Sequence, residues 1–156
     1  MRLVLVIVSG KQPGWVTAGY DEYARRLERR WALELVELPL ARRTAATDPR
    51  RAVTDEAQRM LRHVPAGAHV VALDVGGASW STQALAGRLD AWSLAGAPVY
   101  LLVGGPDGLG NACRERAQEC WSLSALTLPH GLVRIVVAEA LYRAATVLSG
   151  HPYHRA

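Results

Sequence analysis

The sequence predicts an α/β protein built on a parallel sheet, with residues 1–156 forming a single domain. Short apolar runs alternate with segments of helical periodicity, which is the pattern of α/β folds. The runs lie at Leu3–Val8, Ala32–Leu38, His69–Val75, Val99–Val103 and Trp121–Leu128. Runs such as LVLVIV and VYLLV are apolar at every position, as strands covered by helices on both faces must be.

The first run could be mistaken for a secretory signal peptide. Its apolar residues stop at Val8, however, and Gly10 and Lys11 lead into a helical segment, so a strand is the better interpretation. No stretch approaches the roughly 20 apolar residues that a membrane span requires. We therefore expect a cytoplasmic protein with no membrane partner.

Helices are predicted between and after the strands, at Pro13–Arg30, Asp48–Val64, Ser81–Ala95, Asn111–Glu119 and Leu132–Leu148. Pro13 and Pro49 fall where a first-turn proline is tolerated, because the N–H that proline lacks has no partner there. Asp48 and Ser81 are typical N-cap residues for the helices that follow them.

The last predicted helix is apolar around nearly its whole circumference. Its polar side chains are few, chiefly Arg134, Glu139, Arg143 and Thr146. A helix of this kind must be buried on more than one side. A second copy of the chain, related by a two-fold axis, would cover it, so we expect a homodimer.

The net charge is +4, and every basic residue except Lys11 is an arginine. Arginine doublets gather in the first third of the chain, where they fit either RNA phosphates or solvated helix faces. Cys113 and Cys120 match neither a disulfide framework nor a metal clip, so we expect two reduced thiols.

Glycine-rich turns follow two of the predicted strands, as GGPDGLGNAC after Val99–Val103 and LDVGG at the end of His69–Val75. With the segment WSLSALTLPHG they should converge at the carboxyl edge of the sheet, where α/β proteins bind ligands. Such a pocket is apolar, bears hydroxyls and has hardly a charge, which suits an adenine ring better than an anion. A tight turn with no ligand remains the alternative for GGPDGL.

The C-terminal stretch SGHPYHRA contains His151, Tyr153, His154 and Arg155. Zinc requires three or four ligands, and only His130 could be added to the two tail histidines, so we expect no metal. Aromatic, imidazole and guanidinium groups together could stack on a base and hold phosphate.

Several stretches resemble the RlmH family, the small bacterial 23S rRNA pseudouridine N3-methyltransferases of the SPOUT superfamily. They are LVLVIVSGKQPGWV, EYARRL, GGPDGL, WSLSALTLPH, LVRIVVAEALYRA and HPYHR. The resemblance implies a parallel-sheet SPOUT fold with a C-terminal trefoil knot, and a homodimer that binds S-adenosyl-L-methionine. It also implies methylation of a pseudouridine in the intersubunit stem-loop of 23S rRNA, on the assembled ribosome.

Carried over to matching positions, the resemblance implies a cofactor site at Leu73, Gly104, Leu123, Ser124, Ala125, Leu126, Thr127 and Leu128. Its uncharged segment would enclose the cofactor with backbone groups and apolar walls, with hydroxyls capping turns, while Pro129 and His130 turn the chain into the last helix.

The catalytic candidates come from the chemistry of methyl transfer to a nucleobase nitrogen. His154 is the candidate base, because imidazole titrates near neutral pH. Tyr153 could stack on the base, and Arg155 and Arg143 could hold phosphate or stabilise charge on the uracil carbonyls. For Arg143, a helical ion pair with Glu139 is an equally good interpretation.

Two other functions fit the same sequence. One is a SPOUT methyltransferase that acts on a different RNA. The other is a nucleotide- or ribosome-binding protein without catalysis, which the glycine turns and arginine doublets would serve equally well.

Overall fold

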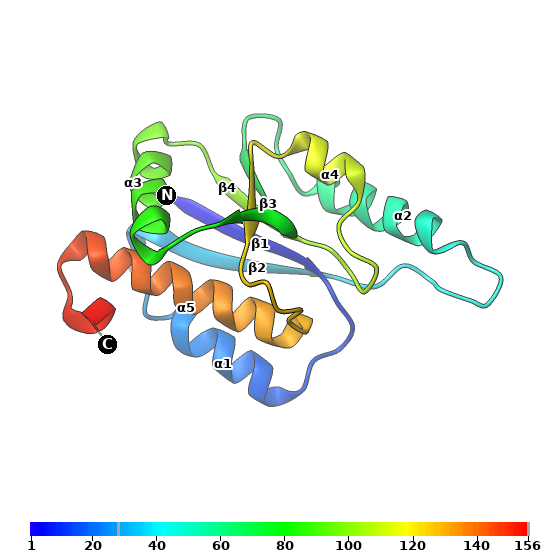
Figure 1. Ribbon diagram of the computed structural model, residues 1–156, viewed down its shortest axis with the longest axis horizontal. Coiled ribbons are helices and arrows are strands. Elements are labelled where there is room, and N and C mark those ends of the chain that lie inside the picture. The colour runs from blue at the N-terminus through cyan, green and yellow to red at the C-terminus, as the bar shows by residue number, and fades with distance from the viewer. Residues whose placement is uncertain (28, 156) are drawn as a thin grey trace.

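The computed structural model describes residues 1–27 and 29–155 and contains a five-stranded sheet (Figure 1). The strands are β1 (Arg2–Val8), β2 (Ala32–Leu38), β3 (His69–Ser79), β4 (Val99–Val103) and β5 (Glu119–Ser122). Their order is β2-β1-β4-β3-β5, and each pairing between neighbours is parallel. The predicted α/β class with a parallel sheet is confirmed.

Helices cover both faces of the sheet (Figure 1). They are α1 (Gly14–Ala24), α2 (Pro49–Arg62), α3 (Thr82–Ala95), α4 (Asn111–Arg116) and α5 (His130–Ser149), with short 3₁₀ helices at Arg29–Trp31 and Pro152–Arg155. Leu5 and Ile7 of β1 pack in the core beneath α1, α3 and α5. Val6 and Val8 pack in a second core beneath α2 and α4. The unbroken apolar run of β1 therefore follows from burial on both faces.

Two predicted helix caps are present. The Asp48 carboxylate accepts a hydrogen bond from the Arg50 amide at 3.0 Å, and the Ser81 hydroxyl accepts one from the Ala84 amide at 3.1 Å. Pro49 occupies the first turn of α2 as expected, whereas Pro13 is the N-cap residue of α1 rather than part of its first turn.

The predicted strand Trp121–Leu128 is wrong beyond Ser122, where β5 ends. Hydroxyl groups compete there with strand pairing. The Ser122 hydroxyl donates to the Ser124 carbonyl at 3.2 Å, and the Leu126 amide donates to the Ser124 hydroxyl at 2.9 Å. Residues 123–128 consequently form a loop.

Two helices also end earlier than predicted. α1 ends at Ala24 rather than Arg30, because the chain turns to bury Leu27 and Trp31. Residue 28, inside the predicted helix, lies outside the described residues. α4 ends at Arg116 rather than Glu119, because Glu119 already belongs to β5.

α5 lies between α1 and α3 against the sheet (Figure 1). Its approach to α1 is close: a Cβ at Gly19 would lie 2.7 Å from Ile135 Cδ1, and one at Gly131 would lie 2.9 Å from Val16 Cγ2. The chain itself thus covers most of the apolar circumference that we attributed to a second copy. The homodimer stays a prediction, as does the knot. Among the described residues no helix is long and apolar enough to cross a membrane.

Arg134 fixes α5 to the ends of the first two strands. This side chain is 2% exposed, and it donates to Glu37 Oε2 at 2.9 Å and to Ser9 Oγ at 2.7 Å. Because a buried guanidinium is costly without a partner, the half-exposed Glu37 should matter more than an ordinary surface glutamate.

We expect Glu37→Ala to lower the free energy of unfolding by about 3 kcal/mol, because it leaves the Arg134 charge buried and without a carboxylate. Glu34→Ala is a matched control, since Glu34 is on the same strand, is 49% exposed and pairs with the 54% exposed Arg2. Its cost should stay below about 1 kcal/mol. Urea unfolding measures both, and equal losses would contradict the assignment.

Candidate functional site

A pocket opens at the carboxyl edge of the sheet, where β3, β4 and β5 end. It is lined by Leu73, Asp74, Val75, Val103, Trp121, Ser122, Leu123, Ser124, Leu126, Thr127, Leu128 and Val133. The predicted meeting of the strand end near Leu73 with the loop after β5 is confirmed. The glycine turn after Val103 contributes no residue to the described lining of the pocket.

An irregularity in β3 makes room for the pocket. Trp121 of β5 is in register with both Leu73 and Ala78 of β3, so residues 74–77 form a bulge. Gly77 allows the bulge to lie against β5, since a Cβ there would be 2.7 Å from the Cys120 carbonyl carbon. Val75 at this rim is 70% exposed, and Leu126 in the facing loop is 73% exposed.

The glycine turn after β4 folds tightly back on itself. A Cβ at Gly104 would lie 2.4 Å from the backbone carbonyl of Gly108, and the Gly108 amide donates to the Gly105 carbonyl at 3.0 Å. Gly108 has φ of +92°, a conformation that favours glycine. The tight-turn interpretation of GGPDGL is therefore sufficient to explain these glycines.

His130 joins the two loops of the site. It is the first residue of α5, and its Nε2 donates a hydrogen bond to the Gly104 carbonyl. The loop 123–129 is thereby tied at its end to the glycine turn. His130 was expected to turn the chain into the last helix and was weighed as a metal ligand, but its contact with the glycine turn was not predicted. The signal available for it was its place directly after the uncharged segment.

The wall of the pocket is nearly free of charge. Among its described lining residues, Asp74 alone carries a formal charge, and this carboxylate accepts from Arg114 Nη2 at 3.1 Å. The Ser122 and Ser124 hydroxyls stabilise turns of the loop, as expected. Apolar side chains and main-chain groups therefore define the ligand surface, which fits a planar, uncharged ring.

Six of the eight predicted cofactor residues line this pocket, namely Leu73, Leu123, Ser124, Leu126, Thr127 and Leu128. Gly104 is buried and Ala125 is exposed, and neither is among the lining residues. Asp74, Val75, Trp121 and Ser122 also line the pocket; they belong to the segments LDVGG and WSLSALTLPHG, which were expected to form it, but not to the predicted cofactor residues. Val103 and Val133 lie outside both segments and were not predicted.

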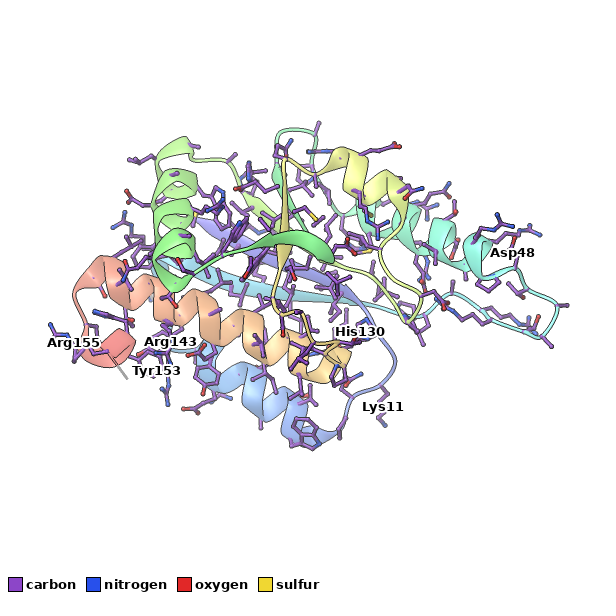
Figure 2. All side chains as sticks on the ribbon, viewed as in Figure 1. Lys11, Asp48, His130, Arg143, Tyr153 and Arg155 are labelled. Atoms are coloured by element: carbon purple, nitrogen blue, oxygen red, sulfur yellow. The ribbon has the colours of Figure 1, made fainter. Side chains whose placement is uncertain are left out.

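The C-terminal tail folds back onto the end of α5. The Tyr153 hydroxyl donates to Glu139 Oε1 at 3.1 Å, and its ring lies 4.6 Å from that of Tyr142. The Arg143 guanidinium lies 4.8 Å from the centre of the Tyr153 ring. Figure 2 shows Arg143, Tyr153 and Arg155 together at one end of α5.

Arg143 also forms the expected helical ion pair with Glu139, with 2.8 Å between Arg143 Nη2 and Glu139 Oε1. Burial, with the hydrogen bond to Glu139, raises the pKa of Tyr153 to about 12, so its hydroxyl stays protonated at neutral pH. His154 Nδ1 is buried and has no hydrogen-bond partner among the described residues. No group of three or more His, Cys, Asp or Glu in residues 1–27 and 29–155 could hold a metal ion.

Within one chain, the pocket with the predicted cofactor residues and the tail with the predicted catalytic residues do not lie together. The pocket lies at the start of α5, near His130, and the tail lies at its end (Figure 2). A helix of 20 residues is about 30 Å long. The tail of a chain therefore lies far from the pocket of that chain.

Comparisons with known proteins give one consistent result. The family model described as "Predicted SPOUT methyltransferase" matches residues 1–154. The chain is 56% identical over 155 residues to Ribosomal RNA large subunit methyltransferase H of Methylococcus capsulatus, covering 99% of this chain and 100% of that one. It is 53% identical over 155 residues to the protein of the same name from Hahella chejuensis, covering 99% of each.

Among solved structures, the SpoU methyltransferase AviRb from Streptomyces viridochromogenes superposes with a TM-score of 0.50 at 17% identity, over 96% of this chain. The chain spans 61% of the length of that structure. At this identity the likeness concerns the fold alone.

We expect His130→Ala to speed amide hydrogen exchange in residues 104–110 and 123–129, because it removes the hydrogen bond that joins the two loops. Exchange measured by mass spectrometry reports both segments. His63→Ala, at the exposed end of α2, is the control and should leave them unchanged. Unaltered exchange in His130→Ala would mean that the loops hold their positions independently.

Proposed function

The chain belongs to the SPOUT methyltransferase family, and from this membership we propose that it transfers a methyl group from S-adenosylmethionine to N3 of a pseudouridine in 23S rRNA. The assembled ribosome is the proposed substrate, which would place the enzyme in the cytoplasm. The main support is that the chain is 53% and 56% identical, over 99% of its length, to two proteins named Ribosomal RNA large subunit methyltransferase H.

The pocket fits the cofactor chemically. An adenine ring suits the apolar wall of Leu73, Leu126 and Leu128, and a cationic sulfonium suits a site whose wall carries no basic side chain. When bound, the cofactor supplies the methyl group from its sulfonium. The loop 123–128 would hold it mainly through main-chain groups, with its own hydroxyls engaged in turns.

The tail would supply the groups that act on the nucleotide. His154 is the proposed base: its imidazole takes the proton from N3 as N3 accepts the methyl group. His154 Nδ1 is buried, so the tail must shift before this atom can reach N3; the shift breaks no hydrogen bond of Nδ1 within the described chain. Tyr153, with its hydroxyl kept neutral, would stack on the base, and Arg143 and Arg155 would hold phosphate or stabilise the anionic uracil carbonyls.

The distance between pocket and tail supports a homodimer with composite sites. If tail and pocket serve one reaction, the tail must come from a second copy, because the length of α5 separates them within a chain. Leu132 and Leu148 are 39% and 37% exposed near the two ends of α5. A two-fold axis across α5 would bring the start of one helix towards the end of the other.

We expect the purified protein to bind S-adenosylmethionine in calorimetry, and to methylate ribosomes only when the target pseudouridine is present.

Thr127→Arg is expected to weaken cofactor binding at least tenfold, because it puts a cation beside the cationic sulfonium. Thr127→Gln is the control, because the glutamine side chain is also long but is neutral, unlike that of arginine. Methylation of ribosomes that lack the pseudouridine would indicate a different RNA target. Absence of cofactor binding would indicate a ribosome-binding protein without catalysis.

Removal of residues 151–156 is expected to abolish methylation but to leave cofactor binding intact, because the pocket does not include the tail. Co-expression of this truncated chain with Thr127→Arg should restore about a quarter of wild-type activity, since random pairing of a dimer gives half mixed dimers with one complete site each. Each variant alone is the control. If mixtures stay inactive although mixed dimers form, tail and pocket do not complement each other across the dimer.

A further inference from the structure

A projecting arm, residues 39–48, follows β2 at the same edge of the sheet as the pocket. In Figure 1 it is the cyan segment that extends beyond the strands towards α2. An extended surface segment needs a reason to hold one conformation, because loops ordinarily gain little from burial. Here the reason is a buried carboxylate.

Glu56 of α2 holds the arm from beneath. Its side chain is 2% exposed, and Oε2 accepts from the Ala41 amide at 2.9 Å and from Arg43 Nη1 at 2.8 Å. Oε1 accepts from Arg43 Nη2 at 2.9 Å. This bidentate pair raises the pKa of Arg43, so the guanidinium is a permanent cation that neutralises Glu56.

The same guanidinium connects the arm to the glycine turn. Arg43 Nε donates to Asp107 Oδ2 at 2.9 Å, two residues beyond Gly105. A Cβ at Gly105 would lie 2.8 Å from Glu56 Oε1, so the turn rests on the same carboxylate. The arm is therefore placed beside the turn to which His130 ties the pocket loop.

The arm and the first turn of α2 carry arginines that the fold does not use. Arg42 and Arg51 are exposed, and their guanidinium groups have no partner in the described part of the chain. Arg50 is 92% exposed and lies 3.5 Å from Asp48, the only acidic group with which it forms an ion pair among the described residues. Arg43 with Glu56 and Asp107 carries a net charge of −1, whereas Arg42, Arg50 and Arg51 with Asp48 carry +2, so these seven groups together are net positive by one.

A groove leads from these arginines towards the pocket. It runs between α2 and the segment 107–114, from Arg50 to Arg114. Arg114 is also the partner of Asp74 on the pocket wall. A chain with a regular series of negative charges could therefore follow one surface from the arm to the rim of the pocket.

We propose that the arm and its exposed arginines, Arg42, Arg50 and Arg51, bind the phosphate backbone of the rRNA strand that carries the target base. This assignment rests on the proposed function and locates part of its substrate surface. Charge complementarity selects RNA as the occupant, and guanidinium groups suit phosphate oxygens. Glu56 and Arg43 are positioning residues, because they hold the arm without touching RNA.

The test compares two double variants that remove the same charge. Arg42→Ala with Arg51→Ala removes cations at the carboxyl edge, whereas Arg29→Ala with Arg62→Ala removes exposed cations at the opposite edge. Ribosome binding is measured between 50 and 200 mM salt, and S-adenosylmethionine binding is measured by calorimetry. All four side chains are exposed, so both variants are expected to fold.

The arm variant should bind ribosomes at least tenfold more weakly, with a salt slope reduced by about one for each phosphate that the variant no longer binds. Its affinity for S-adenosylmethionine should stay within about twofold of wild type, and Arg42→Lys with Arg51→Lys should recover most ribosome binding. Equal losses in the two alanine doubles, or no loss in either, would overturn the proposal. Failure of the proposed function itself would show separately, as a wild-type protein that neither binds the methyl donor nor methylates ribosomes.

Discussion

The seating of α5 between α1 and α3 is the constraint on which the rest of the candidate site depends. Two glycines, Gly19 and Gly131, let α1 and α5 approach closely, and Arg134 fixes the helix to the ends of β1 and β2. The start of α5 then sets the end of the pocket loop. Its other end sets the position of the tail, about one helix length away.

The turn between β4 and α4 is held from two sides. His130 bonds to the Gly104 carbonyl from the pocket side, and Glu56 lies against Gly105 from the side of the arm. Because neither glycine has room for a Cβ, the turn can serve as a rigid partition between the two surfaces. The proposed cofactor surface and the proposed phosphate surface therefore share the same few backbone atoms.

Much of the fold could be predicted from the sequence, because the information is local. The unbroken apolar run of β1 and the caps Asp48 and Ser81 follow from rules that involve neighbouring residues. The end of β5 was missed because serine hydroxyls outcompeted strand pairing after Ser122. The contact of His130 with Gly104 spans 26 positions, and no local pattern encodes it. The segments that form the pocket were predicted because the carboxyl ends of parallel strands meet at one edge, whereas the bulge of β3 at residues 74–77 has no signal in the local pattern.

The strand order has a consequence for folding during synthesis on the ribosome. β1 pairs with β2 on one edge and with β4 on the other. The second partner leaves the ribosome roughly 90 residues after β1, on the order of ten seconds later at usual rates of translation. For that interval β1, which is buried at six of its seven positions in the folded protein, has one open edge. A nascent chain of this topology would gain from a chaperone that shields β1 until β4 arrives.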